Sequence, residues 1–311
     1  MNKKIKALVL FSGGLDSMLS VLLLKDKGIA VVPVCFFSYF FNCQKAQSAA
    51  EELGFKLKKV ALSKEHLKMV KNPQYGRGAA MNPCIDCHLL MLKKAKQIMK
   101  KEGYDFIATG EVLGQRPFSQ NKQALELIER KAGLQGMIVR PLSLKLLEET
   151  IPEQKGLIKR EWFCGIKGRS RKPQLALAKK FKIKNIPLPA GGCILTDRVF
   201  SQKLQQLFSL KKNFNGSDVE LLKAGRVFFK SNLLIVVARN ETESKELAGK
   251  RKKGDIVLEP FSFSGPTVLV RKIKKSSQKE MIDCGTEFLL AYSKNVPADA
   301  VIKILPFPKS C

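Results

Sequence analysis

Apolar and polar positions follow two different periods along the first half of the chain. Continuous apolar runs of strand length, typical of buried strands in a parallel sheet, predict strands at 5–11, 29–37, 57–62 and 106–109. Between them, apolar residues at helical spacing predict helices at 15–27, 44–53 and 87–101, with 63–83 irregular apart from a possible short helix. This alternation predicts an α/β fold, a parallel sheet with helices on both faces.

The pattern changes from about residue 217. Short apolar runs predict strands at 228–229, 233–237, 256–258 and 267–270, and a charged stretch predicts a helix at 241–247. We therefore expect two domains, 1–200 with the parallel sheet and 215–311 as a smaller α+β module, as the length of 311 residues also suggests.

The apolar segments are too short for a membrane protein. None approaches the roughly 18 residues of a membrane span. The basic start and its apolar run lack the length and cleavage site of a signal peptide. We expect a cytoplasmic protein with no membrane partner.

A phosphate-binding loop is predicted at Ser12–Ser17, Ser-Gly-Gly-Leu-Asp-Ser, between the first strand and the first helix. Two glycines allow a sharp turn and a close approach of the backbone to a phosphate, and the helix N-terminus favours an anion. The hydroxyls of Ser12 and Ser17 add donors, whereas Asp16 would hold Mg²⁺ or cap the helix. The alternative is an ordinary strand–turn–helix connection. The loop is not of the Walker type, because the GK[ST] ending is absent.

Three of the eight cysteines stand in a pattern typical of metal or catalytic sites. Cys84 and Cys87 are three positions apart at a predicted helix start, where the helix dipole stabilises thiolates, and Cys193 follows the glycine pair at 191–192. The candidates are a [4Fe–4S] cluster, zinc with His88 or another fourth ligand, metal-free persulfide chemistry, and structural thiols. The haem-attachment spacing CxxCH is rejected for want of an export signal, and disulfides are not expected in the cytoplasm.

The charge balance favours a polyanionic partner. Lys and Arg number 56 against 27 Asp and Glu, a formal +29, which suggests nucleic acid over a merely solvated basic surface. Basic residues are densest at 155–184, where Glu161 is the one acid, with a second cluster at 271–275. Trp162 and Phe163 could stack on a base there, although core packing is the preferred interpretation. The candidate RNA contacts are Lys159, Arg160, Lys167, Arg169, Arg171 and Lys172.

The hexapeptide Ser12–Ser17 resembles the signature of the PP-loop ATP pyrophosphatases, an adenine nucleotide alpha hydrolase-like fold. In that family the loop grips the pyrophosphate of ATP, and AMP is transferred to a substrate oxygen that a nitrogen or sulfur nucleophile then displaces. The stretch 108–111 also resembles the family's strand end beside the nucleotide, and Phe36 has the place of an adenine contact. The resemblance implies ATP binding by Ser12, Gly13, Gly14, Leu15, Asp16, Ser17, Phe36 and Gly110.

The loop, the NPCxxC stretch and a later cysteine together resemble the tRNA thiouridine synthases, notably the 2-thiouridine type. Members with this pattern hold a [4Fe–4S] cluster whose free iron binds sulfide, which implies Cys84, Cys87 and Cys193 as ligands. Members with Asp in the first position use a persulfide, but position 84 is Cys. The resemblance implies catalytic roles for Asp16, Cys84 and Cys193, the cofactors ATP and Mg²⁺, and tRNA and a sulfur donor as partners.

The segment 110–120 departs from the usual 2-thiouridine synthase sequence, so the modified tRNA position stays open. Arg116, Ser119 and Gln120 are candidates for contacts with substrate or nucleotide, the alternative being a polar loop. Neither the sulfur donor nor the oligomeric state is fixed by the sequence.

The stretches 225–230 and 236–241 resemble the RNA-binding module of NFACT proteins. The resemblance implies an RNA-binding role for 215–311, the alternative being a structural or dimerising domain. Cys284 and Cys311 carry no spacing signal.

Loop, cysteines and charge together predict a tRNA uridine sulfurtransferase that adenylates a uridine oxygen and replaces it with sulfur. One alternative is a PP-loop amidating enzyme that uses ammonia, which gives the cysteines no role. Another is a non-catalytic RNA-binding protein that keeps the nucleotide site as a sensor.

Overall fold

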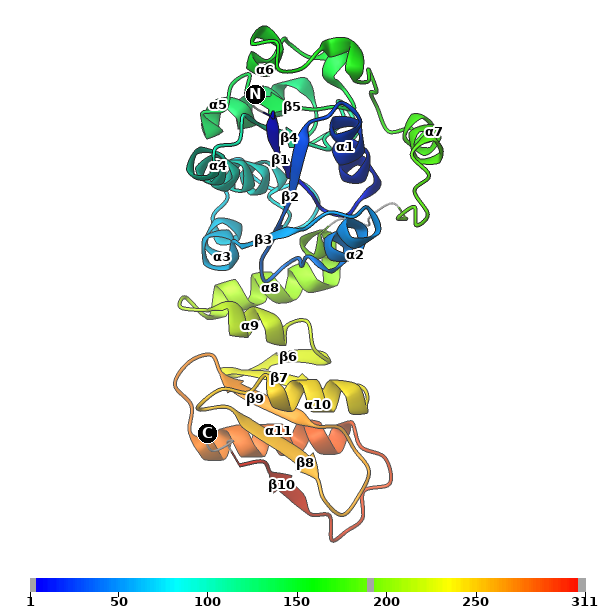
Figure 1. Cartoon of the computed structure of the whole chain (residues 1–311). Helices are drawn as coiled ribbons and strands as arrows, with labels where there is room; N and C mark the ends of the chain where they lie inside the picture. Colours follow the sequence, from blue (N-terminus) through cyan, green and yellow to red (C-terminus); the bar gives the residue numbers. More distant parts are fainter. Residues whose placement is uncertain (1–3, 189–192, 307–311) are drawn as a thin grey trace. The chain divides into compact units, whose positions relative to one another are not determined.

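The computed structural model describes residues 4–188 and 193–306 and divides the chain into two compact units, Met1–Thr196 and Asp197–Cys311 (Figure 1). The glycine pair 191–192 and Cys311, both singled out above, lie outside the described residues. No helix within those residues combines the length and the apolar character needed to cross a membrane.

A five-stranded parallel sheet forms the centre of the first unit. Its order is β3-β2-β1-β4-β5, and every neighbouring pair is parallel, which confirms the predicted α/β fold. In this order β1 lies between β2 and β4. The chain runs from β1 to one side of the sheet and later returns to the other side at β4, and at such a reversal a crevice forms at the carboxyl ends of the strands. The strands are β1 (Lys6–Leu10), β2 (Ala30–Phe37), β3 (Lys58–Ala61), β4 (Phe106–Thr109) and β5 (Ile138–Val139).

Helices cover both faces of this sheet because successive strand residues point to opposite sides. Ala7 and Val9 pack in a core with helices α1, α2 and α7, whereas Leu8 and Ile107 pack in a second core with α4 and α5 (Figure 1). The helices are α1 (Leu15–Asp26), α2 (Gln44–Glu52), α3 (Ser63–Lys71), α4 (Cys84–Glu102), α5 (Lys122–Ala132), α6 (Ile151–Gln154) and α7 (Lys172–Lys180), with 3-10 turns η1 (Leu144–Leu146), η2 (Arg160–Trp162) and η3 (Ile194–Thr196).

Several elements differ from the sequence-based expectation, since β5, α5, α6 and α7 were not predicted and helix α4 begins at Cys84 rather than at Cys87. As a result, both thiols of the CxxC pair lie in the first turn of α4. The possible short helix within 63–83 is the nine-residue α3. The basic segment 155–184 is not one surface element, since it contains the turn η2 and the helix α7.

The second unit is a five-stranded antiparallel sheet with helices, in the order β10-β8-β9-β7-β6. The four predicted strand regions overlap β6, β7, β8 and β9, and α10 covers the predicted helix. The sequence analysis did not find α8, α9, α11 or β10. The elements are α8 (Arg198–Leu210), α9 (Gly216–Leu221), β6 (Arg226–Lys230), β7 (Leu233–Val237), α10 (Glu241–Gly249), β8 (Ile256–Pro260), β9 (Val268–Lys272), α11 (Gln278–Ala291) and β10 (Ile302–Ile304).

Candidate nucleotide and thiol site

The predicted phosphate loop connects β1 to α1 at the carboxyl edge of the sheet. Gly13 has φ +75°, and a Cβ there would lie 2.5 Å from backbone atoms of Lys45, so only glycine fits. Gly14 is the N-cap residue of α1 and has no side-chain cap, which leaves the first amides of the helix without a capping side chain. The Ser17 hydroxyl donates to the Gly14 carbonyl at 2.8 Å.

Asp16 does not cap α1, which removes one of its two expected roles. Its carboxylate accepts a hydrogen bond from Gln115 Nε2 at 3.1 Å instead. Since a carboxylate has about four acceptor positions, this contact leaves room for a cation. Asp16 therefore fits the remaining role, an oxygen ligand for Mg²⁺.

The end of β4 lies against the start of α1. A Cβ at Gly110 would meet the Ser17 nitrogen at 2.7 Å, so this position too requires glycine. Next to it, Glu111 accepts hydrogen bonds from Arg140 Nε at 3.0 Å and His88 Nδ1 at 2.7 Å. Burial acts to raise the pKa of Glu111, but Arg140 and His88 outweigh it and lower this pKa to about 2. The Glu111 carboxylate is therefore ionised at neutral pH, and its hydrogen bonds fix it beside the phosphate loop.

Phe36 differs from its expected role. Its ring is 5% exposed and packs in the core that α4 and α5 cover, so it offers no face to an adenine. The correction follows from strand periodicity, because residue 36 points to the α4 side of β2.

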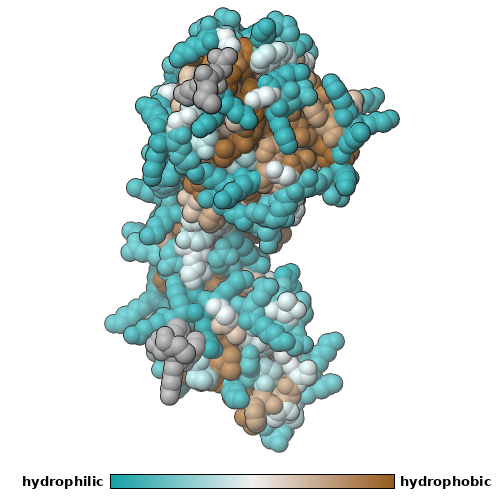
Figure 2. Space-filling view, viewed as in Figure 1, coloured by the Kyte–Doolittle hydropathy of each residue, from teal (hydrophilic) through white to brown (hydrophobic). Residues whose placement is uncertain are grey.

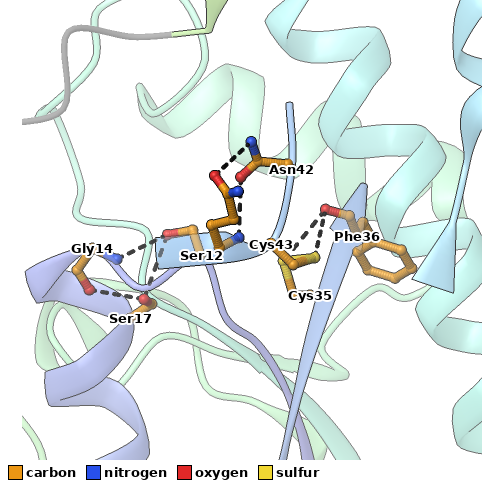
Figure 3. The surroundings of a disulfide bond; sticks show 8 residues. Ser12, Gly14, Ser17, Cys35, Phe36, Asn42 and Cys43 are labelled. Atoms are coloured by element: carbon orange, nitrogen blue, oxygen red, sulfur yellow. Dashed lines mark hydrogen bonds between the residues drawn. A yellow bond between two sulfur atoms is a disulfide. The ribbon is translucent and has the colours of Figure 1, made fainter. Parts of the chain in front are cut away.

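A disulfide joins Cys35 of β2 to Cys43, the N-cap residue of α2 (Figure 3). The expectation that this chain has no disulfide was therefore wrong. The two Cα atoms are 6.0 Å apart because the loop after β2 folds back on the strand end. Both sulfurs are buried and lie near the Phe36 carbonyl. Helix α2 begins directly after Cys43, and its backbone at Lys45 lies against Gly13. The disulfide therefore fixes the start of a helix that packs against the phosphate loop.

The three predicted cysteines lie close enough to interact. Burial raises the pKa of the Cys87 thiol well above its usual value, and the neighbouring Cys193 and Cys84 raise it further. Burial also raises the pKa of the Cys84 thiol. Cys193 contacts the Phe40 carbonyl, with a sulfur–oxygen distance of 3.8 Å.

In the part of the chain that the structure describes, the side chains around these thiols are not arranged to hold a metal ion. Among residues 4–188 and 193–306, no three His, Cys, Asp or Glu side chains are grouped so as to hold a metal ion. Their chemistry nevertheless fits an iron–sulfur cluster, which binds through cysteine thiolates. Buried thiols that resist ionisation gain a counter-charge when a cation binds.

His66 is a neighbour of the thiols that the sequence analysis missed. Its Nε2 is 3.3 Å from Cys87 Sγ, and the Phe40 and Phe41 rings flank it at 5.5 and 5.0 Å between centroids. Burial lowers the pKa of His66 to about 4, so the imidazole is neutral near pH 7. The residue lies on α3, in the segment expected to be mostly irregular.

His88 and Asp86, which flank Cys87 in the sequence, are each hydrogen-bonded to other groups. Nδ1 of His88 bonds to Glu111 at 2.7 Å, so only Nε2 could serve the suggested role as a fourth zinc ligand. Asp86 accepts hydrogen bonds from the backbone amides of Gln74 and Tyr75 at 2.8 and 3.0 Å, and so fixes the segment before α4.

The predicted RNA contacts divide into exposed and half-buried residues. Arg160 is bound to Glu153 at 2.8 Å and donates to two backbone carbonyls, and Arg171 donates to the Pro187 carbonyl at 3.0 Å. Phe163 is buried and Trp162 packs against the same core, as the preferred interpretation held. The exposed members are Lys159, Lys167, Arg169 and Lys172.

Hydrophilic residues cover most of the surface visible in Figure 2, in keeping with the charge of +29. In the second unit, however, Arg271 of the other basic cluster is 1% exposed. Its guanidinium bonds to Asp255 at 2.6 Å and Asp218 at 3.2 Å, so it is a core residue and not an RNA contact.

Comparison with known families agrees with the geometry of both units. Residues 3–151 match the family described as "Thiamine biosynthesis protein (ThiI)". This match spans β1, the Ser12–Ser17 loop and the CxxC helix. The first unit is thus similar to this family over residues 3–151. Residues 225–305 match the "NFACT protein RNA binding domain", so the second unit carries an NFACT-like module.

Curated relatives are similar to parts of the chain. A probable tRNA sulfurtransferase of Methanosarcina mazei is 32% identical over 35% of this chain and 29% of its own length. The tRNA-specific 2-thiouridylase MnmA of Proteus mirabilis is 25% identical over 68% of this chain and 59% of its own. A tRNA-specific 2-thiouridylase MnmA of Malacoplasma penetrans is 29% identical over 40% of this chain. The chain spans about a third of the length of the first relatives it matches.

Two solved structures are similar to parts of the chain. One is a 4-thiouridine synthetase–RNA complex with bound ATP, at 21% identity and TM-score 0.39, covering 65% of this chain and 50% of the other. The second is the U34-tRNA thiolase NcsA from Methanococcus maripaludis with its [4Fe–4S] cluster, at 19% identity and TM-score 0.32, covering 73% and 74%.

Proposed function

We propose that this chain is an ATP-dependent tRNA uridine sulfurtransferase. The observation that carries the proposal is the presence, in one PP-loop domain, of the phosphate loop and of the interacting thiols Cys84, Cys87 and Cys193. The names of the curated relatives, tRNA sulfurtransferases and tRNA 2-thiouridylases, support the same reaction.

The first step uses the phosphate loop. The amides at the start of α1 and the hydroxyls of Ser12 and Ser17 bind the pyrophosphate of ATP, and Asp16 holds Mg²⁺. A uridine carbonyl oxygen attacks the α-phosphorus, the bond to pyrophosphate breaks, and the oxygen becomes part of an AMP leaving group. The protein's contribution is to orient the two reactants and to balance the phosphate charge.

The second step uses the thiols. Cys84, Cys87 and Cys193 would hold a [4Fe–4S] cluster, which when bound supplies an iron site for inorganic sulfide. The sulfur attacks the activated carbon of the base, the carbon–oxygen bond breaks, and AMP leaves with the oxygen. The neutral imidazole of His66 beside Cys87 helps to keep the thiol environment uncharged before loading.

The exposed basic residues of 155–184 bind the tRNA backbone in this proposal. Lys159, Lys167, Arg169 and Lys172 are the candidates that the fold leaves open to solvent. The NFACT-like module holds a second part of the RNA. The uridine itself reaches the loop from a single-stranded region or by extrusion.

The test is an anaerobic reaction of the full chain with Mg²⁺, ATP, sulfide and unmodified tRNA, followed by mass spectrometry of the nucleosides. We expect a thiouridine and one AMP for each sulfur incorporated. Cys84→Ser, Cys87→Ser and Cys193→Ser should each lose more than about 10–100-fold in yield, since even outer partners of a metal cost that much. Cys164→Ser and Cys284→Ser are matched controls, because these free cysteines lie outside the site and should leave the yield unchanged.

The outcomes separate the alternatives. AMP and an amidated product with ammonia, but no thionucleoside with sulfide, would identify an amidating enzyme. Nucleotide binding without release of pyrophosphate in the presence of tRNA and sulfide would identify a non-catalytic RNA-binding protein.

A further inference from the structure

The sheet of the second unit is partly open at its β6 edge. Strand β6 ends the sheet and pairs with β7, its one strand neighbour among the described residues (Figure 1). It is half-buried or exposed along its length, whereas β7 is buried throughout. The β6 positions 226, 228 and 230 share one side of the strand, since successive residues alternate. Their partners on β7 belong to the core that includes Leu289 of α11, so this is the side that α11 covers.

Three aromatic rings meet at this edge. The ring centroid of Phe228 of β6 lies 4.8 Å from that of Phe288 of α11. It lies 5.7 Å from the ring centroid of Tyr292, the C-cap residue of α11. Phe228 and Phe288 are half-buried and pack against the core, whereas Tyr292 is 40% exposed. The rings are therefore anchored in the core on one side and open to solvent at Tyr292.

Two exposed cations border these rings. The guanidinium carbon of Arg226 lies 5.2 Å from the centroid of the Tyr292 ring. Lys230 Nζ lies 6.0 Å from the centroid of the Phe288 ring. The two cations are four residues apart on β6, about 13 Å at the usual rise of a strand, and Phe228 lies midway between them. A positive charge thus stands at each end of the aromatic surface.

The carboxylates near these cations leave them available to an anion. Glu287 is bound to Lys230 at 2.6 Å, but both side chains are exposed, and an exposed ion pair contributes little and can be exchanged for a phosphate. Glu243 is bound to Arg239 at 2.9 Å. Within the described residues, Arg226 itself forms no ion pair.

An unpaired nucleobase has the chemistry that this surface fits. A base offers a flat face that stacks on an aromatic ring, and a cation beside the ring strengthens the contact. In a double helix the neighbouring bases cover those faces, so a paired stem offers its backbone and groove edges instead. The phosphates on either side of a base would also use the two cations, which a neutral planar ligand would not. The geometry therefore favours single-stranded nucleic acid.

We propose that the second unit stacks unpaired bases of its RNA on this surface, here called the ring platform. Its members are the three rings and the two cations that border them, Phe228, Phe288, Tyr292, Arg226 and Lys230. The inference rests on the proposed function, in which the second unit holds part of the tRNA, and it assigns the chemistry of that contact. The ring platform binds a loop or a single-stranded end of the tRNA, not a paired stem.

The test measures binding of a fluorescein-labelled oligouridylate to the full chain by anisotropy, without ATP, Mg²⁺ or sulfide. Tyr292→Leu keeps an apolar side chain but removes the ring, and we expect it to weaken binding about 5–150-fold, the loss of one stacked base. Tyr292→Phe keeps the ring and should bind as the wild type does. Phe261→Leu is the matched control, because Phe261 is 66% exposed and has Lys303 5.0 Å from its ring centroid but lies outside the ring platform.

A ribose–phosphate oligomer of the same length without bases separates stacking from charge. We expect Tyr292→Leu to bind this oligomer as the wild type does. Arg226→Gln should weaken both ligands and lower the slope of log affinity against log salt by about 0.7, the share of one phosphate contact on a single strand. Wild-type affinity of Tyr292→Leu for the oligouridylate, an equal loss in Phe261→Leu, or an equal loss for the oligomer without bases would overturn the inference.

These binding measurements are independent of the overall reaction. Absence of a thionucleoside in the sulfur-transfer assay, together with weakened oligouridylate binding by Tyr292→Leu, would refute the proposed function and leave the ring platform intact. A full yield of thionucleoside with unchanged binding by Tyr292→Leu would refute the ring platform alone. A wild type that sediments as a dimer and a Tyr292→Leu monomer with unchanged oligouridylate affinity would identify the rings as an interface between copies, which also refutes the ring platform.

Discussion

Cys35 and Cys43 form the residue-scale feature with the clearest effect on stability. A disulfide that closes so short a loop is worth about 2–3 kcal/mol through the entropy of the unfolded chain. We expect Cys43→Ser to lower the free energy of unfolding by about that amount in non-reducing buffer, measured by urea denaturation.

Dithiothreitol provides the control for this prediction. It should lower the stability of the wild type by a similar amount but should not affect the Cys35→Ser/Cys43→Ser double variant. A wild type whose two cysteines are both alkylated in denaturant without prior reduction would show that the disulfide is absent.

Single residues were predictable from the sequence where local geometry defines their role. Ser12–Ser17 lies where the strand-to-helix pattern placed it, and Cys84 and Cys87 lie together at a helix start. The contacts of Gln115 and His66 were not predictable, because each pairs with a residue distant in the sequence. Spacing carries no information about such tertiary contacts.

At the scale of elements, the buried strands were the most predictable part. Continuous apolar runs marked β1, β2, β4 and β7 because a strand buried on both faces has no polar alternation. Helix α3 was predicted only as a possible short helix without bounds, because only His66, Leu67 and Val70 of its nine residues are buried. The weak pattern of a short helix, followed by loop residues, resembles an irregular segment.

Helix α9 contains a buried carboxylate, Asp218, that makes the second unit sensitive to acid. Asp218 bonds to Lys211 at 2.9 Å and to Arg271 at 3.2 Å. Burial acts to raise the pKa of Asp218, but the lysine and the Asn215 amide outweigh it and lower this pKa below the ordinary 3.8. A lowered pKa means that its stabilisation is complete above the unfolded-state value and is lost as pH falls through the folded-state value.

We expect Asp218→Asn to remove this acid dependence. Breaking a buried ion pair should also cost about 3–5 kcal/mol at neutral pH, because Arg271 stays buried without a full counter-charge. The measurement is urea denaturation from pH 7 down to pH 3, with the exposed Asp283→Asn of α11 as control. Equal slopes of stability against pH in Asp218→Asn and the wild type would contradict the assignment.

At the scale of the whole molecule, the charge of +29 predicts salt-sensitive binding to tRNA. With 6–10 phosphate contacts, affinity should fall by about 10³–10⁵ between roughly 50 and 200 mM salt. We expect Lys167→Ala/Lys172→Ala to reduce the slope of log affinity against log salt by about 2, measured by filter binding. The exposed Lys131→Ala of α5, outside the basic segment, should change it less; equal slopes for all three proteins would argue against this segment.

The close contact at Gly13 has a practical consequence for experiments on this loop. A glycine-to-alanine change is a common way to disable a phosphate loop. Here the new methyl group would collide with the backbone at Lys45 and Ala46 and would displace the start of α2. Activity lost in Gly13→Ala would therefore report a deformed scaffold as much as a missing nucleotide. Ser12→Ala, whose side chain is exposed and replaceable, is the cleaner nucleotide-deficient reference protein.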